Sequence, residues 1–254
     1  MSERVLLKLG GSVITEKGKE GVIRADAIET IATTLAGQED LALMVVHGAG
    51  SCGHPEAIQY GVASGVSLEN REGIYFTHMA VRSLNDHLVR MFRRNGIEAV
   101  GVQPLSAFVA DNGRLYRPQV GHLECMLDLG VVPVLHGDMV MDRAKGACVV
   151  SGDQLVRALA PPLRMQRIGM ATDVPGVLSG DRVIPEITPE SAGSLDLGLS
   201  SHADVTGGMQ GKVRELCELS LEGIPSEIFH VNRLDDFLHH RPHGGTIVRC
   251  PGHA

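Results

Sequence analysis

Apolar runs of strand length alternate with amphipathic helical stretches along most of the chain. Short runs rich in Val, Ile and Leu are typical of strands that are buried on both faces of a sheet. The predicted strands are Val5–Leu9, Leu41–Val46, Val100–Gln103, Val131–Leu135, Arg167–Ala171 and Ser226–His230. The predicted helices are Ala25–Leu35, Ile74–Arg94, Gly121–Leu129, Gln154–Ala160 and Met209–Glu222.

This alternation predicts an α/β fold in which a mostly parallel central sheet lies between two layers of helices. Pro161-Pro162 marks a turn near the boundary between two closely joined lobes, 1–150 and 151–254. The least regular stretch, Ser179–Ser201, is rich in Gly, Pro and Ser and predicts a hairpin and a mobile loop. Folds of this class bind ligands at the carboxyl ends of their strands, so the loops there are the candidates for chemistry.

The composition narrows the class of protein. A net charge of −7 and a pI of about 5.9 argue against a nucleic-acid partner, which would require a basic surface. No apolar run approaches the roughly 18 residues that span a membrane, and the chain enters its first strand without a signal peptide. The five cysteines are scattered and lack a C-x-x-C pair, which argues against a disulfide framework or a structural zinc site. We therefore expect a cytoplasmic protein with no nucleic-acid or membrane partner.

A loop rich in glycine and histidine follows the second predicted strand. Its glycines, Gly48, Gly50 and Gly53, let backbone N–H groups approach an anion, and a following helix adds its positive end. The same glycines match G-x-G-x-x-G, so a dinucleotide-binding loop is an alternative, weakened by its place on the second strand. A histidine inside the loop can add a positive charge, which favours a phosphate-binding role for His54, whereas His47 fits a structural role.

Lysines accompany two further glycine-rich turns. Lys8 precedes Gly10-Gly11 at the end of the first strand, where its side chain can reach the same crevice. Lys212 follows the glycine-rich segment 204–211 at a helix start, which does not match the Walker A pattern but also suits phosphate. The alternative is a solvated lysine beside a turn, and Lys17 by itself is typical of a surface charge. Two phosphate loops with three lysines suggest a donor and an acceptor that face each other, as phosphoryl transfer requires.

Carboxylates follow two other strands. Asp138 comes after the fourth strand, and Asp153 follows Ser151 at the start of a helix. Ser151 or Asp153 can simply cap that helix, whereas a buried Asp close to two lysines would orient them and hold their charge. Thr172 and Asp173 end the fifth strand, where they could bind a ribose or an adenine edge, although a plain β-turn explains them equally well.

With these elements in order, the chain resembles the amino acid kinase family and, within it, the isopentenyl phosphate kinases. The matching segments are Lys8–Lys17, His47–His54, Ser151–Asp153, Thr172–Val174, Asp204–Lys212 and Gly245-Thr246. The glycine-rich opening and the late T-G-G-M element are widespread in the family. The H-G-A-G-S-x-G-H loop is specific to the subgroup, where its last histidine binds the phosphate of the acceptor.

The resemblance implies a role for each matching residue. The catalytic residues would be Lys8, Lys17, His54, Asp153 and Lys212. The monophosphate of the acceptor would be held by Ala49, Gly53, His54 and Gly152. The nucleotide would be bound by Lys8, Gly10, Gly11, Ser12, Gly50, Thr172, Asp173, Gly176, Gly207 and Lys212. It further implies ATP with Mg²⁺, isopentenyl phosphate as the acceptor, no metal site made by the protein itself, and a homodimer, with the acceptor in lobe 1–150 and the nucleotide in lobe 151–254.

The chain departs from the subgroup in three ways. Cys52 stands where the subgroup usually has Phe, Pro175 replaces an acid, and the hairpin after Val177 is short. A related kinase for another small monophosphate or phosphonate therefore stays open, as does a non-catalytic nucleotide-binding protein of the same fold. The histidines of the segment 239–243 could bind a metal, but no acid or cysteine partner is evident, and we expect a solvated loop.

Overall fold

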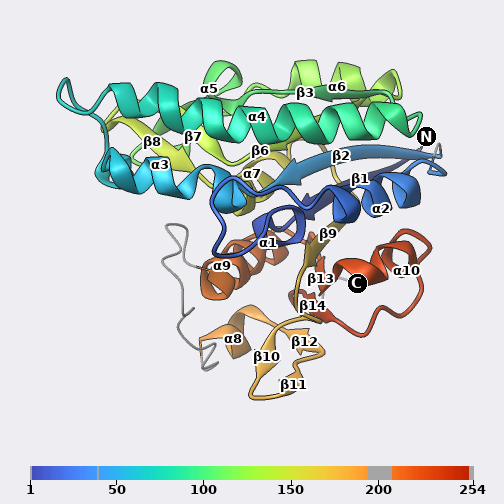
Figure 1. Cartoon of the computed structure of the whole chain (residues 1–254). Helices are drawn as coiled ribbons and strands as arrows, with labels where there is room; N and C mark the ends of the chain where they lie inside the picture. Colours follow the sequence, from blue (N-terminus) through green and yellow to red (C-terminus); the bar gives the residue numbers. More distant parts are fainter. Residues whose placement is uncertain (1, 39, 194–207, 252–254) are drawn as a thin grey trace.

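The computed structural model describes residues 2–38, 40–193 and 208–251. Within them the chain folds around an eight-stranded sheet with the strand order β12-β14-β13-β9-β1-β2-β6-β3 (Figure 1). Its strands are β1 (Glu3–Leu9), β2 (Leu41–His47), β3 (Ala99–Gly101), β6 (Val132–His136), β9 (Arg167–Thr172), β12 (Glu186–Ile187), β13 (Ser226–His230) and β14 (Thr246–Val248).

The predicted mostly parallel sheet is confirmed. Among the neighbouring strands of this sheet in the described ranges, only β13 and β14 run antiparallel. Every predicted strand is present, with ends that differ by no more than two residues. The third predicted strand ends at Gly101 rather than Gln103 because Pro104 opens a short helix, α5 (Pro104–Ala107), where its fixed φ suits the first turn.

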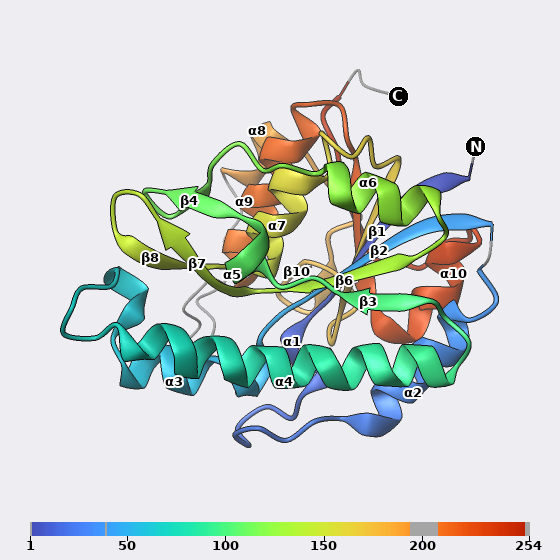
Figure 2. The ribbon, with the colours of Figure 1, turned by 90° about the horizontal axis from the view of Figure 1, so that it is seen from above.

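Helices cover both faces of the sheet, as predicted. One face carries α2 (Ala25–Leu35), α4 (Glu72–Arg94) and α10 (Leu234–Leu238), and the other carries α6 (Gly121–Asp128), α7 (Gly152–Leu159) and α9 (Gly208–Ser220). Figure 2 shows α4 and α6 on opposite sides of the sheet. Strand alternation sorts the side chains of β1, because Leu7 packs in the core with α2 and α4 while Leu6 packs with α7 and α9. Lys8 shares the face of Leu6 and is therefore directed toward α7 and α9.

A second sheet, with the strand order β5-β4-β7-β8, is absent from the sequence prediction. Its strands are β4 (Val109–Asp111), β5 (Arg114–Leu115), β7 (Asp138–Asp142) and β8 (Gly146–Val150). Asn112 and Gly113 form the two-residue turn between β4 and β5, with φ of 50° and 85°. The Asp142 carboxylate accepts hydrogen bonds of 2.7 to 3.1 Å from the amides of Asn112, Gly113, Ala144 and Lys145. This carboxylate ties the two hairpin turns of the second sheet together.

Short elements complete the described chain. They are α1 (Gly11–Ile14), η1 (Gly50–Cys52), α3 (His54–Gln59), η2 (Val62–Ser64), β10 (Leu178–Ser179), β11 (Arg182–Val183), α8 (Pro189–Ala192) and η3 (Val231–Arg233). The hairpin predicted after Val177 is confirmed by the antiparallel pair β10 and β11. The predicted mobile loop falls largely on residues 194–207, outside the described ranges. Among the described residues, no helix has the length and apolar character needed to cross a membrane.

Candidate functional site

Two buried lysines and an aspartate meet beside the carboxyl edge of the main sheet. Lys8 comes from β1, Asp153 from the first turn of α7, and Lys212 from α9. The Lys8 Nζ lies 3.0 Å from the Asp153 Oδ1, and the Lys212 Nζ lies 3.2 and 3.4 Å from the two oxygens of that carboxylate. Each residue has only 6 to 7 % of its surface exposed. We call this group the Lys8–Asp153–Lys212 cluster.

The cluster carries surplus positive charge where water is largely excluded. Burial by itself raises the pKa of Asp153, but the charges of Lys212 and Lys8 outweigh it and lower that pKa to about 2. Burial lowers the pKa of Lys212 to about 8, against the opposing effect of Asp153. One carboxylate thus holds two ammonium groups close together, and the uncompensated charge is suited to an anion such as a phosphate.

The turns that follow β1 and β2 lie in direct contact. A Cβ at Gly11 would lie 2.5 Å from the Gly50 Cα, and a Cβ at Gly48 would lie 2.9 Å from the Gly11 backbone nitrogen. Gly50 has a positive φ of 57°, and a Cβ there would strike the Thr15 side chain. The two turns approach each other this closely because they carry glycine.

One expected backbone donor is already engaged. The Gly10 N–H is hydrogen-bonded to the Ala171 carbonyl at 2.9 Å, so this backbone donor is occupied, and the place of Gly10 in the nucleotide site stays a prediction. Gly11 and Ser12 open α1 instead, and the first amides of a helix have no acceptor within that helix. The anion-binding amides of this turn are therefore expected one and two residues later than Gly10.

The start of α7 combines a structural and a charged residue. The Ser151 hydroxyl accepts a hydrogen bond of 3.1 Å from a backbone amide of the first turn, so Ser151 caps the helix. Asp153, two residues later, holds the lysines instead. A Cβ at Gly152 would lie 3.2 Å from the His47 carbonyl oxygen and 3.4 Å from the Lys8 Cε. Glycine thus lets α7 begin close to the ends of β1 and β2.

The residues expected on the acceptor side lie around the start of α3. His54 is half-buried and is the first residue of that helix. A Cβ at Gly53 would lie 2.4 Å from the Val81 Cγ1 of α4 and 3.3 Å from the Ala49 Cβ, so glycine lets α3 begin against α4. Cys52 is buried in the core cluster of α2 and α4, and burial raises the pKa of its thiol.

His47 is a structural histidine, as the sequence favoured. It is fully buried, with its Nδ1 2.9 Å from the Gly48 carbonyl oxygen and its Nε2 3.1 Å from the Asn85 Nδ2. Burial lowers the pKa of His47 to about 4, so the ring is neutral at pH 7. Nδ1–H then donates to the carbonyl and Nε2 accepts from the amide of Asn85.

Lys17 does not join the buried cluster. Its Nζ lies 2.7 Å from the Asp173 Oδ2, and its side chain is 61 % exposed. Burial raises the pKa of Asp173, but hydrogen bonds from Lys17 and Ser12 outweigh burial and hold that pKa below its usual value. Lys17 and Asp173, which the sequence assigned to different roles, are therefore ion-pair partners in this structure.

The other residues expected on the nucleotide side have structural contacts. The Thr172 hydroxyl donates to the Val174 carbonyl at 2.7 Å. Gly176 packs closely, because a Cβ there would lie 2.8 Å from the Thr246 Oγ1. Gly207 lies outside the described residues. Contacts of Thr172 and Gly176 with a nucleotide therefore stay a prediction.

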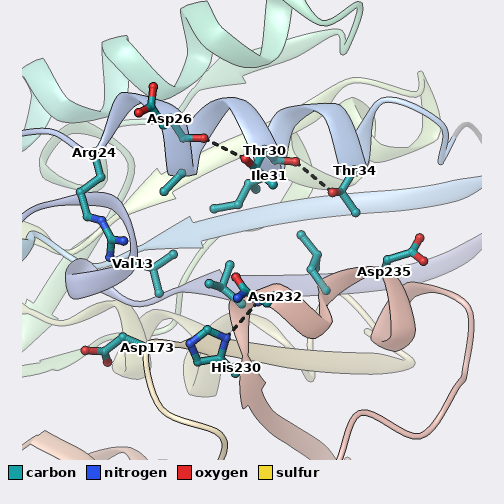
Figure 3. Close-up of a pocket in the computed structure, with 13 residues that line it drawn as sticks. Val13, Arg24, Asp26, Thr30, Ile31, Thr34, Asp173, His230, Asn232 and Asp235 are labelled. Carbon is teal, nitrogen blue, oxygen red and sulfur yellow. Dashed lines mark hydrogen bonds between the residues drawn. The ribbon is translucent and has the colours of Figure 1, made fainter.

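A cavity of about 370 Å³ opens beside Asp173, between α2 and the segment that joins β13 to α10 (Figure 3). In Figure 3, Asp173 and His230 lie at one end of the cavity with Arg24 above them. Neither Lys8 nor Lys212 is among its lining residues. The cavity is thus a separate space on the sheet face that carries α2 and α10.

No group of three or more His, Cys, Asp or Glu side chains within the described ranges is placed to hold a metal ion. The histidines of segment 239–243 each face a different carboxylate. The pairs are His239 with Asp235 at 3.1 Å, His240 with Glu3 at 3.5 Å, and His243 with Glu227 at 2.7 Å. Separate partners keep these imidazoles from converging on one ion.

Two side-chain contacts are not predicted by the sequence. Asp138 does not meet the lysines, because its Oδ2 lies 2.9 Å from the Nδ1 of His78 on α4. Arg114, on β5, forms an ion pair with Glu215 of α9. The Asn112-Gly113 pair is a recognised hairpin signal and could have located Arg114 at a turn. No local pattern connects His78 with a strand of the second sheet.

Comparison with known proteins identifies the relatives of this chain. The model of the amino acid kinase family matches residues 3–230. An isopentenyl phosphate kinase of Haloferax volcanii is 41 % identical over 248 residues, which cover 96 % of this chain and 98 % of that protein. An isopentenyl phosphate kinase of Methanothermobacter thermautotrophicus is 38 % identical over 243 residues, covering 89 % and 90 % of the two chains.

Solved structures agree with these matches. A crystal structure of an isopentenyl phosphate kinase superposes with a TM-score of 0.83 at 33 % identity, covering 96 % of this chain and all of that one. A substrate complex of an isopentenyl phosphate kinase superposes with a TM-score of 0.78 at 25 % identity and the same coverage.

Proposed function

Because the chain belongs to the amino acid kinase family, we propose that it is an ATP-dependent kinase that converts isopentenyl phosphate to isopentenyl diphosphate. The Lys8–Asp153–Lys212 cluster carries this proposal. A phosphoryl group in transfer spreads negative charge over its oxygens, and preorganised cations in a dry site stabilise that charge. The protein's part is to position the two substrates in line and to hold the charge.

The acceptor side of the proposal depends on His54. A monophosphate carries more negative charge than a carboxylate and needs a donor of its own, and His54 can supply one at the start of α3. Gly53 and Ala49 lie beside His54. Gly152 packs closely against the His47 carbonyl oxygen, at the start of the same loop. This arrangement would hold the acceptor phosphate close to the cluster.

We propose that Mg²⁺ arrives with the nucleotide. The one buried carboxylate of the cluster, Asp153, is already engaged by two lysines, and no metal-binding group is found among the described residues. A magnesium ion of this kind is held mainly by substrate phosphates and water, and it neutralises charge on the phosphates when bound. Lys8 and Lys212 would complement it with fixed positive charge.

A coupled assay of ADP release with isopentenyl phosphate tests the proposal. Wild-type protein should turn over, and His54→Ala should lose acceptor-dependent turnover while it still binds ATP, measured by calorimetry. His122→Ala, which removes an exposed histidine from α6, is the control and should match the wild type. Unchanged turnover in His54→Ala would remove His54 from the site.

A related kinase for another small monophosphate or phosphonate is the second candidate. Cys52 favours it, because this small buried side chain lies next to Gly53, at a position where the family resemblance leads one to expect phenylalanine. A panel of monophosphates of graded size, compared by kcat/KM, separates the two. A higher kcat/KM for a bulkier phosphate than for isopentenyl phosphate would favour the second candidate.

The homodimer, the cytoplasmic location and the two lobes stay predictions. Light scattering on the purified protein measures the mass in solution against 27.1 kDa for one chain. Limited proteolysis near residue 150 tests whether 1–150 and 151–254 behave as separate lobes.

A further inference from the structure

Arg114, which follows the Asn112-Gly113 turn, reaches from the second sheet to α9. Its Nη1 pairs with the Glu215 Oε1, and its Nη2 lies 3.2 Å from the Glu218 Oε2. Glu215 is buried, with 8 % of its surface exposed, and lies one helical turn after Lys212. A carboxylate in such a place is costly unless a cation neutralises it.

Arg114 is the cation that neutralises Glu215. The other carboxylate oxygen of Glu215, Oε2, is buried without a hydrogen-bond partner among the described residues. Burial raises the pKa of Glu215, while the hydrogen bond and the charge of Arg114 oppose that rise. Without Arg114, the nearest cation that α9 itself offers at helical spacing is Lys212, three residues earlier.

The hairpin that presents Arg114 is firmly anchored. Burial by itself raises the pKa of Asp142, but hydrogen bonds from the amides of Gly113, Lys145 and Ala144 outweigh it and lower that pKa to about 2. This carboxylate therefore stays ionised and holds the turn that comes immediately before Arg114. The anchored hairpin thus holds the Arg114 guanidinium against α9 from outside the cluster.

We propose that Arg114 is a positioning residue for phosphoryl transfer, because it neutralises Glu215 and so keeps Lys212 paired with Asp153 rather than with Glu215. The inference rests on the proposed function, which assigns Lys212 to the transferring phosphate. Among the described residues, Arg114 forms ion pairs with Glu215 and Glu218 of α9 and none with the three residues of the cluster.

Asp153 and Lys8 have the largest charge effects on the pKa of Lys212. Several charged groups lie on α9 and on the elements around it. From neighbouring elements they are Lys8 of β1, Asp153 and Arg157 of α7, Arg114 of β5 and Glu190 of α8, and on α9 itself they are Arg214, Glu215 and Glu218. Of these, Asp153 and Glu215 are the two buried carboxylates. Arg157 pairs with Glu218, at 3.7 Å, and with Glu222 rather than with Glu215.

The test compares Arg114→Ala, the double variant Arg114→Ala/Glu215→Gln, and the control Arg214→Ala. Arg214 lies on the same helix and makes an exposed pair with Glu218 at 3.7 Å. Arg114→Ala should lower kcat on the order of tenfold with little change in the KM of the acceptor, because a displaced cation weakens transition-state binding. The double variant should recover most of this loss, because the competing carboxylate is gone, and the control should match the wild type.

A second readout needs no turnover. Amine-reactive labelling of Lys212 is followed by mass spectrometry across pH, and its midpoint reports the pKa of that ammonium group. Arg114→Ala should move the midpoint upward from the wild-type value, because an unpaired carboxylate favours the charged lysine, and the double variant should move it back. An unmoved midpoint, or a double variant that stays as slow as Arg114→Ala, overturns the inference. If the midpoints of the variants move as expected but the wild type does not phosphorylate isopentenyl phosphate, the proposed function fails, and Arg114 keeps only its effect on the pairing of Lys212 with Asp153.

Discussion

The Lys8–Asp153–Lys212 cluster and the Lys17–Asp173 pair use the same kinds of residue in opposite surroundings. The cluster is buried between β1, α7 and α9, whereas the Lys17 side chain is 61 % exposed and that of Asp173 is 31 % exposed. Charges that are buried cannot be removed singly without a large cost, while an exposed pair contributes about 0 to 1 kcal/mol. The fold thus fixes one set of cations in place and leaves Lys17 in an exposed ion pair.

The largest expected effect comes from the centre of the cluster. Asp153→Ala leaves two ammonium groups buried without a counter-charge, which should lower the free energy of unfolding by about 3 to 5 kcal/mol. Turnover should fall on the order of a thousandfold, because both lysines lose their orientation. Urea unfolding and the ADP-release assay measure the two effects. Asp173→Ala is the matched control, and its free energy of unfolding should change by less than about 1 kcal/mol. Equal losses in the free energy of unfolding of Asp153→Ala and Asp173→Ala would contradict the expected difference between the cluster and the exposed pair.

The glycines beside the two regions give a second contrast. Gly11→Ala places its Cβ 2.5 Å from the Gly50 Cα, so it should cost about 1 to 3 kcal/mol and lower kcat on the order of a hundredfold. Gly18, next to Lys17, has a φ of 74° and open space around its Cβ position. Gly18→Ala should cost only about 1 to 2 kcal/mol of backbone strain and leave kcat unchanged. Thermal unfolding and steady-state kinetics of the two variants test this.

The pH dependence sharpens the comparison further. Activity should fall about tenfold per unit above the pKa of Lys212, about 8, as that ammonium loses its proton. Stability should respond in the opposite sense. Since an unfolded lysine titrates near 10.4, the unfolded state holds more protons between pH 8 and 10, and the Lys212 contribution to the free energy of unfolding rises there. The free energy of unfolding of the wild type, compared with that of Lys212→Met across this pH range, isolates that contribution. A wild-type activity profile that is flat to pH 10 would contradict the expected loss of activity.

At the acid end, the contribution of Asp153 to the free energy of unfolding also rises with pH. Its pKa is lowered to about 2 in the folded state, so its stabilising contribution is present above about pH 3.9 and is lost as the pH falls toward 2. Acid unfolding of Asp153→Asn should therefore be less steep than that of the wild type over this range.

The smallest effect is expected at the exposed pair. Lys17→Ala should change the free energy of unfolding by less than about 0.5 kcal/mol, since surface substitutions of this kind seldom do more. It should lower kcat on the order of tenfold if Lys17 supplies charge to the transition state. The difference in kcat between Lys17→Ala and the wild type should shrink at high ionic strength, because exposed charges are screened. A kcat equal to that of the wild type would show that Lys17 serves only as the partner of Asp173.

The regular elements were predictable because each spans several periods of its own pattern. Ala25–Leu35 was placed at the residues that the structure shows, and the buried strands were placed to within two residues. The second sheet was missed because β4 and β5 span only three and two residues, and because the five-residue strands β7 and β8 carry no clear alternation of apolar and polar side chains. Its turn signal, Asn112-Gly113, was present but lay outside any long apolar run.

The sequence by itself determined which turns carry glycine, which strand ends carry lysine, and that the sheet is mostly parallel. Only the tertiary structure decided the partners: Asp153 for Lys8 and Lys212, Asp173 for Lys17, His78 for Asp138, and Glu215 for Arg114. The physical reason is that hydrophobic period and turn chemistry act over a few neighbouring residues. An ion pair between residues far apart in sequence depends instead on which helices pack on the same face of the sheet, and on how deeply that packing buries the charges.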